Sequence, residues 1–267
     1  MFKYLETITV TSTESGIYTI ALNRPEVHNA FNENMIQELI QTLCSLREEY
    51  EPRVLILTGS GKSFCAGADL NWMKRSSEYT EKENFEDAER MATMMNLLYS
   101  FPTPTIALVH GSVFGGGVGL VACCDIAFAD NDTVFSLSEV KLGLIPSVIG
   151  PYVTEAIGMR NARRYFLTGE RFDAAAAYHL GLVHDRGSAE ESIRFKTAVV
   201  KQLLSCGPQA QALAKQMIQN VYASNPIDEQ IQSVTAKKIA TVRAGEESRE
   251  GVSAFLEKRS PAWRKNI

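Results

Sequence analysis

Residues 105–129 read TIALVHGSVFGGGVGLVACCDIAFA and form the most informative segment of the chain. An apolar run ends in three consecutive glycines, Gly115, Gly116 and Gly117, and the sequence becomes apolar again at once. The pattern predicts a strand, a tight loop, a short helix and a second strand that begins at Ile126. Three glycines in a row lose much conformational entropy on folding, so we expect a loop whose backbone a ligand approaches closely. Close packing of the strand against the helix is the alternative.

If a helix begins at these glycines, its first amide N–H groups have no partner within the helix. They point out of the helix end, where they can bind an anion or a negative charge that develops during a reaction. The loop sequence alone leaves both interpretations open.

Strand-like and helix-like segments alternate through the first 180 residues. Alternating apolar positions at 7–12 and 17–22 predict an antiparallel hairpin. The helices and buried strands that follow are expected, in chain order, at 32–50, 54–58, 83–99 and 105–109. This alternation indicates an α/β core.

Strand signals fade beyond residue 180, and helical spacing takes their place. Helices are expected over residues 189–205, 208–222, 227–244 and 248–258. We therefore divide the chain into a core of residues 1–200 and a helical C-terminal region of residues 201–267.

Composition excludes several classes of protein. The chain of 267 residues has a formal net charge of −4, so it lacks the concentrated basic surface that nucleic-acid binding needs. Its five cysteines form no CxxC pair and its four histidines show no metal-type spacing, which favours reduced core thiols and no metal site. The first residues lack a signal-peptide pattern, and no apolar stretch reaches the roughly 18 to 20 residues of a membrane helix. We expect a cytoplasmic protein without membrane contact.

Two nucleotide-binding motifs are approached but not completed. The segment LTGSGKS at 57–63 ends like a P-loop, but Ile56 stands where that motif needs its first glycine. Residues 117–122 fit the GxGxxA dinucleotide fingerprint, but the helix that they open spans roughly 12 Å, which is short for a Rossmann crossover. The chain has no GxSxG motif, and Cys65 is more readily a packed thiol than a nucleophile.

Two acidic residues are candidates for chemistry. Asp69, in the segment FCAGADL, is placed to cap a turn or helix after the strand at 54–58. Glu139 is a lone carboxylate between apolar stretches, and burial near a ligand would raise its pKa toward the range useful in proton transfer. Its position in the sequence is equally compatible with a surface or ion-pair role.

Five motifs, in order, resemble those of the crotonase, or enoyl-CoA hydratase/isomerase, superfamily. The matching segments are 24–30 (RPxxxNA), 64–70 (FxAGAD), 111–120 (the glycine loop), 138–146 (E…G…P) and 168–183 (TGE…A…GLV). Residues 255–261 also resemble the family's C-terminal FxEKRxP helix end. The resemblance covers nearly the whole chain.

The resemblance implies an α/β, crotonase-like spiral of ββα units with a helical C-terminal region that assembles trimers or pairs of trimers. It also implies an acyl-CoA substrate, of which coenzyme A is a part, and no separate cofactor. The N–H groups of Ala68 and Gly116 would bind the thioester oxygen as an enolate forms, and Glu139 would act as acid and base. The implied substrate-binding positions are Ala66, Asp69, Leu70, Gly115, Gly117, Gly119, Pro146, Phe255 and Lys258.

Gly119 departs from the two-acid hydratases, which carry their first glutamate at this position. A single Glu139 could activate water toward the β-carbon and return the proton to the α-carbon, or move a proton between carbons as an isomerase does. A carboxylate on the substrate is another candidate to fill the space that Gly119 leaves. An acyl-CoA-binding or assembly protein that has lost catalysis is the third alternative.

Residues 64–74 and 143–152 resemble bacterial methylglutaconyl-CoA hydratases of leucine breakdown, and glycine at position 119 is similar to that group. We therefore expect a hydratase (lyase) that acts on 3-methylglutaconyl-CoA. Lys74, Arg75 and Lys141 are considered as partners of a substrate carboxylate, although each could be solvated or bound to phosphate instead.

Overall fold

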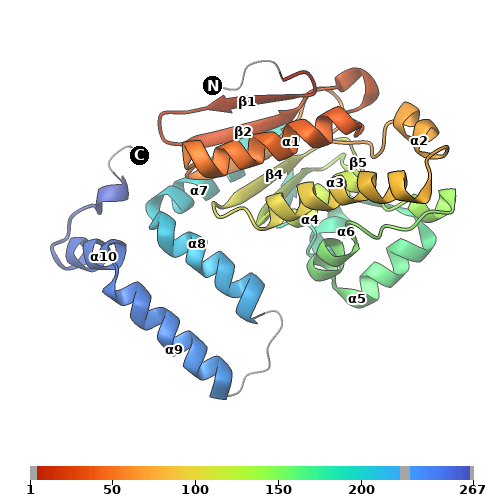
Figure 1. The fold of residues 1–267 in the computed structure, drawn as a ribbon. Coiled ribbons are helices and arrows are strands. Elements are labelled where there is room, and N and C mark those ends of the chain that lie inside the picture. Colours follow the sequence, from red (N-terminus) through yellow and green to blue (C-terminus); the bar gives the residue numbers. More distant parts are fainter. Residues whose placement is uncertain (1–4, 223–228, 265–267) are drawn as a thin grey trace.

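The computed structural model describes residues 5–222 and 229–264, and a six-stranded sheet forms its centre (Figure 1). Its strands are β1 (Ile8–Ser12), β2 (Ile17–Leu22), β3 (Val54–Gly59), β4 (Thr105–Val109), β6 (Ile126–Asp130) and β9 (Asp185–Gly187). They lie side by side in the order β1-β2-β3-β4-β6-β9, in which only the β1–β2 hairpin is antiparallel. A smaller sheet has the order β5-β7-β8 and consists of β5 (Ser112–Phe114), β7 (Val134–Ser136) and β8 (Arg171–Asp173).

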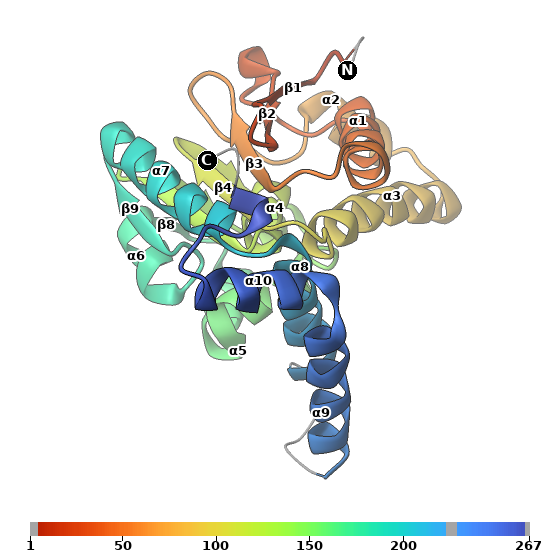
Figure 2. The same ribbon diagram turned by 90° about the vertical axis from the view of Figure 1, so that its left-hand side faces the viewer.

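The central strand β3 is covered on both faces, which explains its unbroken apolar sequence. Leu55 and Leu57 belong to the larger core, which includes residues of helices α1 (Glu33–Ser45) and α3 (Glu81–Tyr99). Val54 and Ile56 point the other way and pack with residues of α7 (Ala189–Ser205). The sheet is therefore a middle layer between two sets of helices (Figure 2).

The predicted alternation of strands and helices is confirmed, with changes at the helix ends. The segment 32–50 begins with Asn32 as the N-cap, since its side chain accepts a hydrogen bond from the Met35 amide at 2.9 Å. It continues as α1 only to Ser45 and ends in a π-helical turn, Leu46–Tyr50. The helix expected from residue 83 begins at Glu81, because Thr80 and Glu83 form a capping box.

Several elements were not predicted. Strand β9 contradicts the expectation that strand signals end at residue 180, and it has only three residues. Strand β8 is equally short. Helix α2 (Leu70–Ser76) has seven residues and was predicted only as the turn or helix that Asp69 caps. Helix α5 (Gly150–Thr168) is interrupted at Gly158, whose φ of 77° and ψ of 152° are not helical. Short or interrupted elements show little periodicity.

The C-terminal part is helical, as expected. It contains α8 (Pro208–Met217), a π-helical turn (Ile218–Tyr222), α9 (Glu229–Ala244) and α10 (Glu246–Leu256). Residues 227 and 228 of the expected third helix lie outside the described residues. Helix α9 extends away from the sheet in both views (Figures 1 and 2). The division proposed after residue 200 falls inside α7, and no helix in the described residues is long and apolar enough to cross a membrane.

Candidate active site

A cavity of about 440 Å³ opens between the glycine loop, α2 and the segment 138–149, and its wall is mostly apolar. The lining residues used below are Ala66, Ala68, Leu70, Trp72, Met73, Ser76, Met91, Gly115, Gly116, Ser138, Glu139, Pro146, Ser147 and Ile149. The cavity thus gathers three sequence-predicted segments that lie far apart along the chain.

Asp69 fixes the loop that carries Ala68. Its Oδ1 atom accepts hydrogen bonds from the amides of Asn71 (2.8 Å) and Trp72 (3.3 Å), which makes Asp69 the N-cap of α2, as predicted. Its Oδ2 atom accepts from Nη2 of Arg24 at 2.8 Å. Burial alone would raise the pKa of this carboxyl, but the hydrogen bonds from Arg24 and the two amides more than offset it and lower the pKa. Asp69 therefore stays ionised as a structural anchor and does not line the cavity.

Backbone pairing leaves the amide of Ala68, which lines the cavity, without a partner. Ala68 forms a parallel bridge with Phe31, in which the Phe31 amide donates to the Gly67 carbonyl (2.7 Å) and the Asp69 amide donates to the Phe31 carbonyl (2.8 Å). Successive amides of an extended segment point to opposite sides, so the Ala68 N–H faces away from Phe31. No acceptor within residues 5–222 and 229–264 takes this N–H.

Gly116 supplies a second free amide. It is the first residue of α4 (Gly116–Cys123), so its N–H has no partner within the helix, and the described part of the chain offers it no other acceptor. The two donor loops are joined directly, because the Phe114 amide donates to the Cys65 carbonyl at 2.9 Å. Two unpaired amides on one cavity wall form a site for an oxygen that gains negative charge.

A side chain would be unfavourable at each of the three glycines, for a different physical reason at each position. Gly115 has a φ of 50°, and a Cβ there would lie 3.2 Å from Oε1 of Glu139. A Cβ on Gly116 would lie 2.5 Å from Cε of Met91, and one on Gly117 would lie 2.7 Å from the Cys65 carbonyl oxygen. Gly117 therefore serves close strand-to-helix packing and does not line the cavity, whereas Gly115 and Gly116 do. Both interpretations of the loop apply, to different residues.

Glu139 is the only acidic residue that lines the described cavity. It opens a 3-10 helical turn, Glu139–Leu142, that ends at Gly143 with a left-handed φ of 73°. Its Oε2 atom is buried and has no hydrogen-bond partner in the described residues. Burial raises the pKa of this carboxyl, and a hydrogen bond from its own backbone offsets part of the rise. A carboxyl group whose pKa is raised in this way holds a proton more readily than an ordinary glutamate, which suits a group that must both take and return one.

Comparison with known proteins shows the family to which the chain belongs. Residues 12–266 match the model of the family described as enoyl-CoA hydratase/isomerase. The chain belongs to the enoyl-CoA hydratase/isomerase family. Its structure is similar to that of an enoyl-CoA hydratase from Shewanella pealeana, with 44% identity, a TM-score of 0.93 and coverage of 97% of this chain and 96% of that one. An enoyl-CoA hydratase/isomerase from Marinobacter aquaeolei gives 30% identity and a TM-score of 0.91, with 97% and 99% coverage.

A curated relative from Alternaria alternata, named as an enoyl-CoA hydratase, is 33% identical over 249 residues, which are 91% of this chain and 79% of the relative. The family assignment confirms the crotonase-type fold and the enzyme class expected from the motifs. Both the Alternaria alternata relative and the Shewanella pealeana protein are named as enoyl-CoA hydratases, and each matches more than nine-tenths of this chain.

In this member of the family the space beside Gly119 is filled. A Cβ at this position would overlap Cγ2 of Ile149 and lie 3.2 Å from Cε of Met95. Both side chains are buried, with exposures of 2% and 0%. The suggestion that a substrate carboxylate occupies this space is therefore wrong, because core side chains close it. Gly119 itself does not line the cavity.

The cations considered for a substrate carboxylate do not reach the cavity. Arg75 pairs with Glu33 at 2.8 Å, and neither Lys74 nor Lys141 is among the lining residues. No lysine or arginine in the described part of the chain lines the cavity. Phe255 and Lys258 also lie elsewhere: Phe255 belongs to α10 and is 82% exposed, and Lys258 follows that helix.

Sequence reasoning predicted Leu70 but missed the other lining residues of α2. Trp72, Met73 and Ser76 face the cavity at spacings of one and four residues, which place them on one side of a helix. The sequence signal that could have revealed them was the apolar pair Trp72–Met73, which comes shortly after the Asp69 cap. Seven residues are too few for a periodic pattern to be read without knowing where the helix begins.

Cys65 is excluded as a nucleophile. Its side chain is fully buried, and burial raises the pKa of its thiol to about 12, so the reactive thiolate is not populated at neutral pH. The packed-thiol interpretation also holds for Cys123, which is buried, but not for Cys206, which is exposed.

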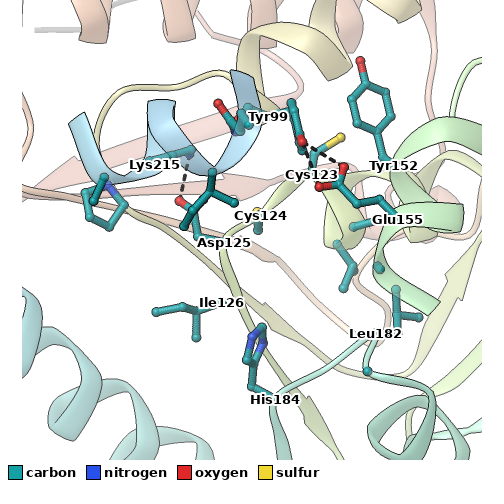
Figure 3. Close-up of a pocket in the computed structure, with 18 of the residues that line it drawn as sticks. Tyr99, Cys123, Cys124, Asp125, Ile126, Tyr152, Glu155, Leu182, His184 and Lys215 are labelled. Carbon is teal, nitrogen blue, oxygen red and sulfur yellow. Dashed lines mark hydrogen bonds and ion pairs between the residues drawn. The ribbon is translucent and has the colours of Figure 1, made fainter. Parts of the chain in front are cut away.

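A second cavity, of about 520 Å³, lies at the other end of α4, where α8 meets the core (Figure 3). Its charged groups are already paired: Nζ of Lys215 lies 2.8 Å from Oδ2 of Asp125, and the Tyr99 hydroxyl donates to Oε2 of Glu155 at 2.8 Å. Burial raises the pKa of Cys124 to about 12. The Lys215–Asp125 pair fastens α8 to the core, and the Tyr99–Glu155 pair joins α3 to α5. We assign the chemistry to the first cavity, which holds the two free amides and Glu139.

Proposed function

We propose that the protein adds water to an α,β-unsaturated acyl-CoA thioester, with Glu139 as acid and base and the amides of Ala68 and Gly116 as oxyanion donors. The observation that carries this proposal is the buried, unpartnered Oε2 atom of Glu139 in the cavity that holds both free amides. Water addition needs these components: a base for water, donors for the enolate oxygen and an acid for the α-carbon.

The reaction then balances with one carboxyl group. Glu139 takes a proton from water while the water oxygen forms a bond to the β-carbon. The electron pair of the double bond then forms a new double bond between the α-carbon and the thioester carbon, and the π pair of the carbonyl group moves to the thioester oxygen. The N–H groups of Ala68 and Gly116 hold the charge on that oxygen; one such donor is typically worth about 3 kcal/mol in the transition state. The enolate collapses as its α-carbon takes the proton from Glu139, which leaves the carboxylate ionised again.

We propose 3-methylglutaconyl-CoA as the substrate, in leucine degradation. The support is the resemblance of residues 64–74 and 143–152 to hydratases of that group, together with the glycine at 119. Coenzyme A enters as part of the substrate, and the mechanism requires no further cofactor. The cavity gives no lysine or arginine to a substrate carboxylate, so any contact with it must come from hydrogen-bond donors.

Isomerisation is the second candidate, because the cavity presents a single carboxylate among the described residues. The same Glu139 would remove a proton at one carbon and return it two carbons away, with the same enolate and the same donors. An acyl-CoA-binding protein without turnover is the remaining alternative.

Purified protein should be assayed with crotonyl-CoA, 3-methylglutaconyl-CoA and a 3-enoyl-CoA. Water addition to either of the first two supports the hydratase; conversion of the third without hydration establishes the isomerase; binding without turnover establishes the non-catalytic alternative. Replacement of Glu139 by glutamine should lower kcat on the best substrate by roughly 10²- to 10⁴-fold. Near wild-type turnover in that variant would refute the single-acid mechanism.

We also propose a cytoplasmic homotrimer or dimer of trimers built through residues 201–267. An apolar groove between α8 and α9, lined by Leu213, Met217, Ile239 and Val242, supports contacts of this region with other copies. Sedimentation of the full chain, compared with an Ile239→Lys variant, tests the assembly.

A further inference from the structure

Met91 is a methionine of the catalytic cavity that the mechanism does not use. It lies on α3 and is partly exposed, whereas Met94 and Met95 on the same helix are 0% exposed. The backbone of a helix lies inside its layer of side chains, so the exposed surface of Met91 belongs mainly to its side chain. Because Met91 lines the cavity, a small solute that enters the cavity meets this side chain and not those of Met94 and Met95.

The methyl group of Met91 packs on the glycine that supplies one of the two free amides. A Cβ on Gly116 would lie 2.5 Å from Cε of Met91. The sulfur atom is one bond away from this methyl group, and the unbranched side chain of methionine rotates about three bonds. A polar atom added to the sulfur is therefore within reach of the Gly116 N–H, which has no acceptor in residues 5–222 and 229–264.

Oxidation of the thioether adds such an atom. A lone pair of the sulfur attacks one oxygen of hydrogen peroxide, so that an S–O bond forms and the O–O bond breaks. The departing hydroxide takes the proton from the transferred oxygen and leaves as water. The sulfur is oxidised, the peroxide is reduced, and no other reactant is needed. The product, methionine sulfoxide, is polar and carries an oxygen that accepts hydrogen bonds.

We propose that Met91 is a modification site at which peroxide oxidation closes the oxyanion site. The sulfoxide oxygen accepts the Gly116 N–H and takes the place assigned to the thioester oxygen. Only the effect on turnover rests on the proposed function. Loss of one oxyanion donor typically lowers turnover by roughly 10²- to 10³-fold, so the oxidised protein should be nearly inactive. Methionine sulfoxide reductases reverse the modification.

Treatment with hydrogen peroxide, followed by a thiol reductant, tests the effect on turnover. The reductant restores cysteine disulfides and sulfenic acids but leaves methionine sulfoxide in place. Mass spectrometry of peptides follows the oxidation of Met91, and an assay with the best substrate follows kcat. We expect kcat to fall by roughly 10²-fold or more in step with oxidation of Met91 and to recover with methionine sulfoxide reductases. Full turnover in protein whose Met91 is oxidised would overturn the proposal.

Met91→Leu is the test variant, and Met159→Leu is its matched control. Met159 is 67% exposed on α5 and does not line the cavity, so peroxide reaches it at least as readily. The activity of each treated variant is compared with that of the same variant before treatment. Met91→Leu should keep its kcat under peroxide, whereas Met159→Leu should lose activity as the wild type does. Equal sensitivity of the wild type and Met91→Leu would overturn the proposal.

The amide signal of Gly116 gives a readout that depends neither on turnover nor on a variant. In ¹⁵N-labelled wild type, the Gly116 amide proton should move downfield as Met91 is oxidised, because it gains an acceptor. The amide of Gly251 in α10 serves as the internal reference. An unchanged Gly116 signal overturns the role of Met91 even if crotonyl-CoA is hydrated. A shift that follows oxidation of Met91 supports this role even if no substrate gains water, in which case the proposed hydratase activity alone fails.

Discussion

Replacement of Gly119 by alanine tests whether Ile149 closes the place of the second acid. An alanine in the middle of α4 would ordinarily gain about 0.5–1 kcal/mol over glycine. Its Cβ would overlap Ile149 and crowd Met95, and overpacking of this kind costs about 1–3 kcal/mol. We therefore expect Gly119→Ala to lower the free energy of unfolding by up to about 2.5 kcal/mol.

The sign should change when Ile149 is shortened. Ile149→Ala alone should cost about 2–5 kcal/mol as a buried truncation, but Gly119→Ala added to it should be close to neutral or stabilising. Urea unfolding of the four proteins at one protein concentration gives a coupling energy of about 1–3 kcal/mol.

Gly150→Ala is the matched control. A Cβ at Gly150 would meet its nearest atom, Cε2 of Phe166, at an ordinary 3.6 Å, so this change should not destabilise the protein. Additivity of Gly119→Ala and Ile149→Ala within about 0.5 kcal/mol would refute the claim that Ile149 fills this space.

Two further predictions concern the carboxylates. Burial raises the pKa of Glu139 above its unfolded value, so the folded state holds the proton longer and stability falls as pH rises through that interval. Glu139→Gln should therefore be more stable than wild type at pH 8 and equal to it below the ordinary glutamate pKa, as measured by urea unfolding at several pH values; a constant difference would contradict this. Asp69→Ala removes the α2 cap and the Arg24 pair, and should cost about 1–3 kcal/mol of stability and lower kcat by displacing the Ala68 amide. Because the pKa of Asp69 is lowered on folding, the stability that Asp69 contributes should be lost as pH falls from the ordinary aspartate pKa through its lower folded-state pKa. The control Glu81→Ala, in the exposed first turn of α3, should change the free energy of unfolding and kcat little.

The sequence predicted the parts of the fold that have strong local signals. Strand β3 was predictable because burial on both faces gives a continuous apolar run. The start of α1 was predictable because Asn32 is a good N-cap. Strand β9 was not, since three residues that include Asp185 and Arg186 form a strand only through pairing with β6.

The site was predictable to the extent that it depends on backbone and motif. The neighbourhood of Ala68, Gly116 and Glu139 follows from the family resemblance, and the structure brings all three to one cavity. The filling of the space at Gly119 was not predictable, because Ile149 lies 30 residues away in sequence and meets it only in the folded core. The wrong expectation came from treating a missing side chain as empty space, although protein interiors are close-packed.

Because the two donor loops are joined through the main chain, the spacing of their amides does not depend on the side chains that line the cavity. The spacing between the Ala68 and Gly116 amides depends on main-chain bonds, through the Phe31 bridge and the Phe114–Cys65 bond, and on the start of α4. The acyl wall depends on side chains from α2 and residues 144–149. Redesign of this wall through Met73 or Val148 can therefore proceed without moving the two amides to which we assign the enolate oxygen, which makes this scaffold a favourable starting point for changing substrate while keeping reactivity.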